Sequence, residues 1–149
     1  MKRSQRLATL LKLVAMAEKN SRRALGEASH RTKECHDQLE MLSRYQREYS
    51  EQWLNRGQSG ITGSDLRLLD GFRKQLDGTV TTQNHQLALA EQQKAQAAAR
   101  WQQTRLRETS LLGLYESQLA REELESEKRV QREMDERSVV SVDPLTEIF

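Results

Sequence analysis

The chain has 149 residues, of which 31% are charged and only 5% are aromatic, and its mean hydropathy is −0.86. So few large apolar side chains do not suffice for the core of a globular domain of this length. The abundance of Ala, Leu, Glu, Gln, Arg and Lys is typical of long helices and coiled coils, so we expect an all-α protein.

The net charge of +2 is too small to indicate a nucleic-acid-binding protein. No stretch of the sequence approaches the length of a transmembrane helix, so we expect no direct membrane insertion. The charge is uneven, because residues 1–33 carry nine Lys and Arg against two Glu. A single cysteine, Cys35, excludes an internal disulfide and fits a reducing cytosol.

The first predicted element is a helix over about residues 4–56. Apolar or small side chains recur along it at alternating steps of three and four residues, which is the heptad pattern of a coiled coil. The positions expected in this seam are 7, 10, 14, 17, 21, 24, 28, 35, 42, 45 and 49. A neighbouring stripe widens the apolar face and consists of Leu11, Leu25, Thr32, Leu39 and Trp53.

A turn is predicted over residues 57–63, which contain three of the seven glycines. Glycine adopts positive φ without steric cost, so we expect the chain to reverse near Gly60. Thr62 or Ser64 can accept hydrogen bonds from the first N–H groups of the following helix. A short loop between long helices makes them antiparallel neighbours, so the predicted fold is an elongated two-helix hairpin.

The second predicted helix covers about residues 64–137, which makes residues 1–137 one coiled-coil unit. Residues 78–82 combine a glycine with β-branched side chains, so we expect a bend or greater mobility there. Pairing about the tip joins positions whose numbers add up to roughly 120 and leaves the second arm longer, with a charged overhang beyond about residue 115. Residues 138–149 lack helical periodicity, and we expect a mobile tail.

The sequence predicts no catalytic site, no metal ligands and no cofactor. It contains no phosphate-binding Gly-x-x-x-x-Gly-Lys motif and no paired cysteines for zinc. His30 and His36 flank Cys35, but neither is spaced four residues from another histidine. Carboxylates on a helix surface lack the concave, water-excluding pocket that catalysis requires.

Aromatic residues supply the strongest candidate site. Tyr45, Tyr49 and Trp53 are four residues apart and share one helix face. Pairing about the tip places Phe72 and Leu76 opposite this face. These side chains either pack the two arms together or form a patch that binds a partner, because exposed aromatics are frequent interface anchors.

Several stretches, at their spacing in this chain, resemble the flagellar export protein FliJ family. The resemblance covers nearly the whole chain and is carried by Leu25-Gly26-Glu27, Gln38-Leu39-Glu40-Met41-Leu42, Tyr45-Gln46-Arg47-Glu48-Tyr49, Gly60-Ile61, Phe72 with Leu76, Lys128-Arg129 and Glu133-Met134-Asp135-Glu136.

The resemblance implies a non-enzymatic component of bacterial flagellar type III protein export, built like the central stalk of rotary ATPases. Its implied partners are the hexameric flagellar export ATPase, the cytoplasmic domain of the export gate protein and flagellar substrate chaperones. The implied location is cytoplasmic, at the cytoplasmic face of the inner membrane at the flagellar base. The family's gate-contacting patch maps onto Gln38, Leu42, Tyr45, Tyr49, Phe72 and Leu76. Two further patch positions differ here and hold Thr79 and Gln83.

Two other functions fit the same pattern. The chain is similarly compatible with the equivalent stalk protein of a virulence type III secretion system. The basic amphipathic arm at residues 1–33 is also compatible with binding to a membrane surface.

Overall fold

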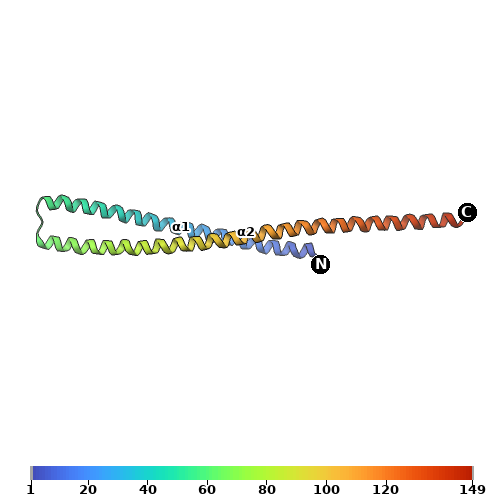
Figure 1. Cartoon of the computed structure of the whole chain (residues 1–149), viewed down its shortest axis with the longest axis horizontal. Coiled ribbons are helices and arrows are strands. Elements are labelled where there is room, and N and C mark those ends of the chain that lie inside the picture. The colour runs from blue at the N-terminus through green and yellow to red at the C-terminus, as the bar shows by residue number, and fades with distance from the viewer. Residues whose placement is uncertain (1, 149) are drawn as a thin grey trace. The chain divides into compact units, whose positions relative to one another are not determined.

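The computed structural model describes residues 2–148, with side chains described for residues 2–139. Two helices, α1 (Arg3–Gln58) and α2 (Gly63–Ile148), account for the fold, and the described residues contain no strand. The predicted helical hairpin is confirmed, and its arms are unequal, with 56 residues in α1 and 86 in α2 (Figure 1).

The turn lies where its glycines predict it, between Gln58 and Gly63. Gly60 has a φ of +91°, a backbone conformation that side-chain-bearing residues rarely adopt. The Thr62 hydroxyl accepts a hydrogen bond from the backbone N–H of Asp65 at 3.3 Å and so caps the start of α2.

The chain divides into two compact units. In residues 19–103, α1 and α2 run antiparallel from the turn, and the Thr32 hydroxyl donates to the Ala90 carbonyl at 3.2 Å (Figure 1). The other unit combines residues 1–18 with residues 104–149. In it the Ser4 backbone N–H donates to Glu122 Oε1 at 3.2 Å.

The side of α1 that faces α2 differs in part from the predicted seam. Positions 7, 14, 21, 28, 35, 42 and 49 are shielded, as expected. Between them the shielded positions are 11, 18, 25, 32, 39, 46 and 53, whereas positions 10, 17, 24 and 45 are exposed. The stripe that was predicted only to widen the apolar face therefore supplies about half of the α1 positions that contact α2. A heptad can alternate as three-then-four or as four-then-three residues, and packing against the partner helix selects one of the two.

Polar groups are built into the seam of residues 19–103. Gln83 is buried, and its Nε2 donates to Gln38 Oε1 at 3.0 Å and to the Cys35 carbonyl at 3.3 Å. Ala90 is buried close by and lets the helices approach each other. A buried polar side chain with satisfied hydrogen bonds stabilises one register of a coiled coil over its alternatives.

Residues 78–82 lie within continuous helix. The hydroxyls of Thr79, Thr81 and Thr82 each donate to the carbonyl four residues earlier, at 3.0 Å. Such bonds compete with the backbone ladder and often bend a helix. The expected mobility of this segment stays a prediction.

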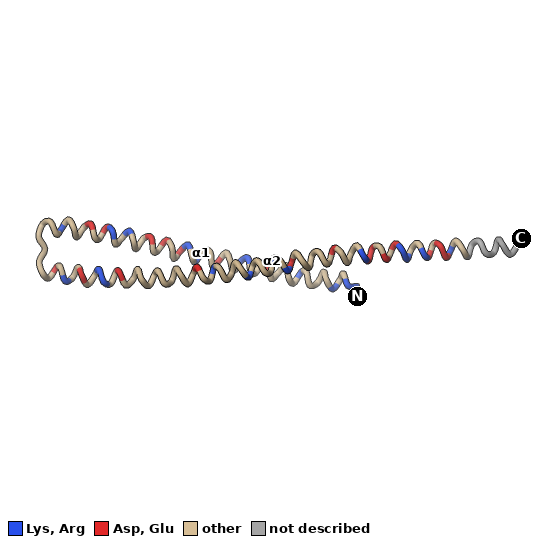
Figure 2. The backbone as a smooth tube through the Cα atoms, viewed as in Figure 1, with Lys and Arg blue, Asp and Glu red and all other residues tan. Residues whose placement is uncertain are grey.

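The exposed overhang of α2 begins later than predicted. Glu122 is half-buried beside Ser4, and every residue from 123 to 139 is exposed. Acidic and basic residues are interspersed along this segment (Figure 2). Helix α2 continues beyond the predicted end at Arg137 to Ile148. The predicted tail, residues 138–149, lies mostly outside the residues whose side chains are described, and its mobility stays a prediction.

Candidate protein-interaction surfaces

Four aromatic rings form a continuous cluster near the turn, with three from α1 and one from α2. The Tyr49 ring lies closest to Phe72, with centroids 4.5 Å apart, and meets Trp53 edge-on at 5.8 Å. Tyr45 lies 6.4 Å from both Tyr49 and Phe72. Aromatic pairs at these separations attract each other beyond the effect of area burial alone.

The cluster both packs the hairpin and reaches solvent. Tyr49 and Trp53 are half-buried between the helices. Tyr45 is 49% exposed and Phe72 is 37% exposed, although their ring centroids lie only 6.4 Å apart. The sequence left open whether these side chains pack or face solvent, and the structure assigns Tyr49 mainly to packing and Tyr45 mainly to the surface.

The remaining positions of the implied gate patch occupy the same part of the hairpin. Leu42 and Leu76 are half-buried, and Gln38 is exposed. Gln83 is buried in the seam, whereas Thr79 is exposed. Gln83 therefore belongs to the helix contact, which limits the exposed edge of the patch at that position.

A second surface near the turn was missed in the sequence analysis. An open groove of about 570 Å³ is lined by both helices, and exposed leucines from each, Leu54 and Leu66, line it together with Trp53. The signal was present in the sequence, since the numbers of Leu54 and Leu66 add up to 120, which predicts that they lie at the same height on the two helices.

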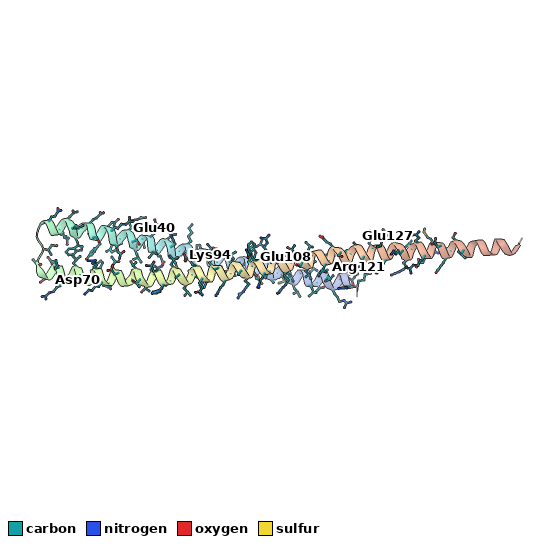
Figure 3. All side chains as sticks on the ribbon, viewed as in Figure 1. Glu40, Asp70, Lys94, Glu108, Arg121 and Glu127 are labelled. Carbon is teal, nitrogen blue, oxygen red and sulfur yellow. The ribbon has the colours of Figure 1, made fainter. Side chains whose placement is uncertain are left out.

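The overhang carries a third surface. Leu124, Val130 and Met134 are exposed among charged neighbours, and a shallow groove of about 450 Å³ runs past Val130 and Met134 beside Glu127. Glu127 is labelled on this part of α2 in Figure 3.

Glu122 marks the base of the overhang electrostatically. Hydrogen bonding with Ser4 lowers the pKa of the Glu122 carboxyl, and Gln118 and Lys2 act in the same direction. The carboxylate of Glu122 is therefore favoured when residues 2–18 lie against this part of α2.

One trio of possible metal ligands lies on α1. Side-chain atoms of His36, Asp37 and Glu40 lie within 4.8 Å of one another, and all three residues are exposed. The spacing of histidines and cysteines does not predict this trio, because two of its three members are carboxylates. Glu40 already pairs with Arg44 at 3.6 Å, which weakens the trio as an ion site.

Among the described residues, neither helix has a stretch that is both long enough and apolar enough to cross a membrane.

The family model described as "Flagellar FliJ protein" matches residues 2–142, which is nearly the whole chain. No curated protein and no solved structure matches the chain.

Proposed function

The chain belongs to the flagellar FliJ protein family, a family of flagellar type III export components, and we propose that it acts in export as a non-enzymatic stalk. In this role it binds the hexameric export ATPase, contacts the cytoplasmic domain of the export gate protein and escorts substrate chaperones. It works in the cytoplasm, at the cytoplasmic face of the inner membrane at the flagellar base.

The proposed gate contact is supported by the exposed part of the aromatic cluster. Tyr45 leaves about half of its surface to solvent while its ring lies against Tyr49 and Phe72. A tyrosine held in place by neighbouring rings loses little conformational freedom on binding, which suits an interface anchor. The proposed gate surface consists of Gln38, Leu42, Tyr45, Tyr49, Phe72 and Leu76.

The observation that supports the ATPase contact is the overhang of α2. Residues 123–139 are exposed throughout and combine apolar side chains with both signs of charge. The basic residues of the arm at 2–33 add positive charge at the open end of the hairpin. A helix with this mixed surface can enter a protein pore whose lining is both apolar and charged.

The gate contact is tested by a binding assay of Tyr45→Ala against the purified cytoplasmic domain of the gate protein. We expect at least tenfold weaker binding, because truncating an anchor residue at an interface costs about 2 kcal/mol or more, and tenfold corresponds to about 1.4 kcal/mol. Met41→Ala, an exposed substitution on the same helix, serves as the control, and circular dichroism checks helix content. Unchanged binding by Tyr45→Ala would assign the gate contact to another surface.

The ATPase contact is tested by ending the chain after Glu122. This truncation keeps the contact between Ser4 and Glu122 and removes the exposed overhang. We expect the shortened protein to lose stimulation of ATPase ring assembly. Full stimulation by the shortened protein would exclude the overhang as the ATPase-binding segment.

One observation favours a second candidate function, binding to an anionic membrane surface. Leu10, Leu13 and Met16 are exposed on α1 within the basic arm. Sedimentation with vesicles that contain phosphatidylserine tests this function, and binding that salt does not weaken would count against it.

A further inference from the structure

The groove beside the turn has an apolar centre and exposed apolar rims. Trp53, Ile61 and Leu69 line it and are half-buried, whereas Leu54 is 70% exposed and Leu66 is 57% exposed. One of these exposed leucines comes from each helix. Covering both would remove apolar surface from water at about 25 cal/mol for each Å².

This groove is distinct from the exposed face of the aromatic cluster. Neither Tyr45 nor Phe72 lines it. Leu54 follows Tyr45 by nine residues on one helix, and nine steps of about 100° place the two side chains on opposite sides of α1. The groove and the proposed gate surface share Tyr49, whose ring lies between them.

The charge of the groove indicates what it binds. A second groove adjoins this one further from the turn, and Arg73 lines both. Within the described residues, no hydrogen bond or ion pair engages the Arg73 guanidinium. Arg47 and Glu51 line the adjoining groove, where the Asp77 carboxylate already accepts a hydrogen bond from Gln46 at 2.8 Å. The junction of the two grooves therefore offers an unpaired arginine to a carboxylate.

We propose that this groove binds an amphipathic helix of a partner protein, which presents two apolar side chains one turn apart and a carboxylate one turn further on. The first apolar side chain covers Leu54 and Leu66, which pairing about the tip places at one height, and the second lies over Leu69. The carboxylate then pairs with Arg73, which lies one turn beyond Leu69 on α2. A third helix between two packed helices is a common recognition mode, and tryptophan, tyrosine and arginine are frequent binding hot spots. This inference does not rest on the proposed role in export.

The experiment uses the full-length protein and the fluorescence of Trp53. The chain has two tryptophans, so Trp101→Phe leaves Trp53 as the only one, and it lines the groove. The probes are designed amphipathic peptides with two leucines four residues apart and a glutamate four residues further on, made in both chain directions. We expect a saturable blue shift of Trp53 emission with one of the two peptides.

Replacing the peptide's glutamate by lysine should weaken binding about tenfold, as expected for the loss of a charge-assisted hydrogen bond. The double substitution Leu54→Lys with Leu66→Lys should abolish the shift. Met41→Lys with Leu68→Lys is the matched control, since these residues are also exposed, lie one on each helix and do not line the groove. The control and Tyr45→Ala should both bind the peptide normally, which separates this surface from the gate surface.

Three results would overturn the proposal. The first is the absence of a saturable shift with either peptide at millimolar concentration. The second is equal binding of the glutamate and lysine peptides, which would show apolar adhesion without recognition by Arg73. The third is self-association in analytical ultracentrifugation that the Leu54 and Leu66 double substitution abolishes, since the occupant would then be a second copy of this chain.

Discussion

Tyr45 and Tyr49 are one helical turn apart, yet their substitution by alanine should have different effects on stability. Tyr49 is half-buried and pairs with three rings, the closest being Phe72 at a centroid distance of 4.5 Å. Tyr45 is 49% exposed, and its two ring pairs both have centroid distances of 6.4 Å.

The expected magnitudes follow from burial and ring contacts. Truncating a fully buried phenylalanine or tryptophan to alanine costs about 3–5 kcal/mol, and tyrosine is of similar size. Since Tyr49 is only half-buried, Tyr49→Ala should lower the free energy of unfolding of the hairpin near the turn by roughly 2 kcal/mol. Tyr45→Ala removes mainly exposed surface and two distant ring pairs, so its cost should be below about 1 kcal/mol.

The assay is urea unfolding followed by Trp53 fluorescence in the Trp101→Phe background. Trp53 lies 5.8 Å from Tyr49 and therefore reports on the unfolding of this region. Met41→Ala provides the exposed control on α1. Equal destabilisation by Tyr45→Ala and Tyr49→Ala would refute this division between packing and surface, and Tyr45→Ala would then be unsuitable for testing the gate contact alone.

Three further predictions concern the seam, the base of the overhang and the weak segment of α2. Gln83→Leu should raise the free energy of unfolding of residues 19–103 by about 1 kcal/mol, and with it the urea midpoint, because leucine gains burial while Gln38 is exposed enough to bond water. A lower midpoint would show that the glutamine pair is net stabilising. Glu122 has a lowered pKa in the folded chain. Its carboxylate therefore stabilises the contact with residues 2–18 at pH values above the ordinary pKa of glutamate, and this stabilisation is lost as the pH falls through the lowered pKa. In the unaltered protein, amide protection of residues 2–18 should therefore fall at acid pH, and Glu122→Gln should remove this dependence. An identical pH profile in both proteins would contradict the role given to the Glu122 carboxylate. Gly78→Ala should slow amide exchange over residues 78–82 and stabilise α2 by about 1 kcal/mol, because alanine favours helix more than glycine does. The added Cβ fits, since it meets no atom within 4 Å. Unchanged exchange would show that this segment is not a weak point.

The sequence was sufficient for the elements and the turn because these depend on local chemistry. The glycines at 57–63 interrupt two long runs of helix-forming residues, and Gly60 has the positive φ that the reversal requires. Thr62 caps α2 through its hydroxyl, as its position before the helix predicts. The end of α2 was less predictable, since the absence of apolar periodicity after Arg137 does not stop the helix, which continues to Ile148.

Helical spacing and pairing about the tip pointed to Tyr45, Tyr49, Phe72 and Leu76, and the family resemblance added Gln38 and Leu42. The structure adds how far each of these side chains is exposed. Tyr45 and Tyr49 have the same residue type and helical spacing from their neighbours, so the sequence could not say which one faces the partner helix. The groove at Leu54 and Leu66 was missed because two leucines at pairing positions normally indicate a buried contact, whereas these two are exposed.

By itself the sequence determined that the chain is two long helices joined at Gly60, because propensity, capping and positive φ are properties of neighbouring residues. Only the tertiary structure decided which stripe of α1 meets α2. Leu10 and Leu11 are both apolar, yet Leu11 is shielded and Leu10 is exposed. Which stripe faces α2 depends on how side chains of both helices interlock along the seam, including the hydrogen bond between Gln83 and Gln38. These two residues are 45 positions apart in the chain, so the sequence around either of them does not reveal that they meet.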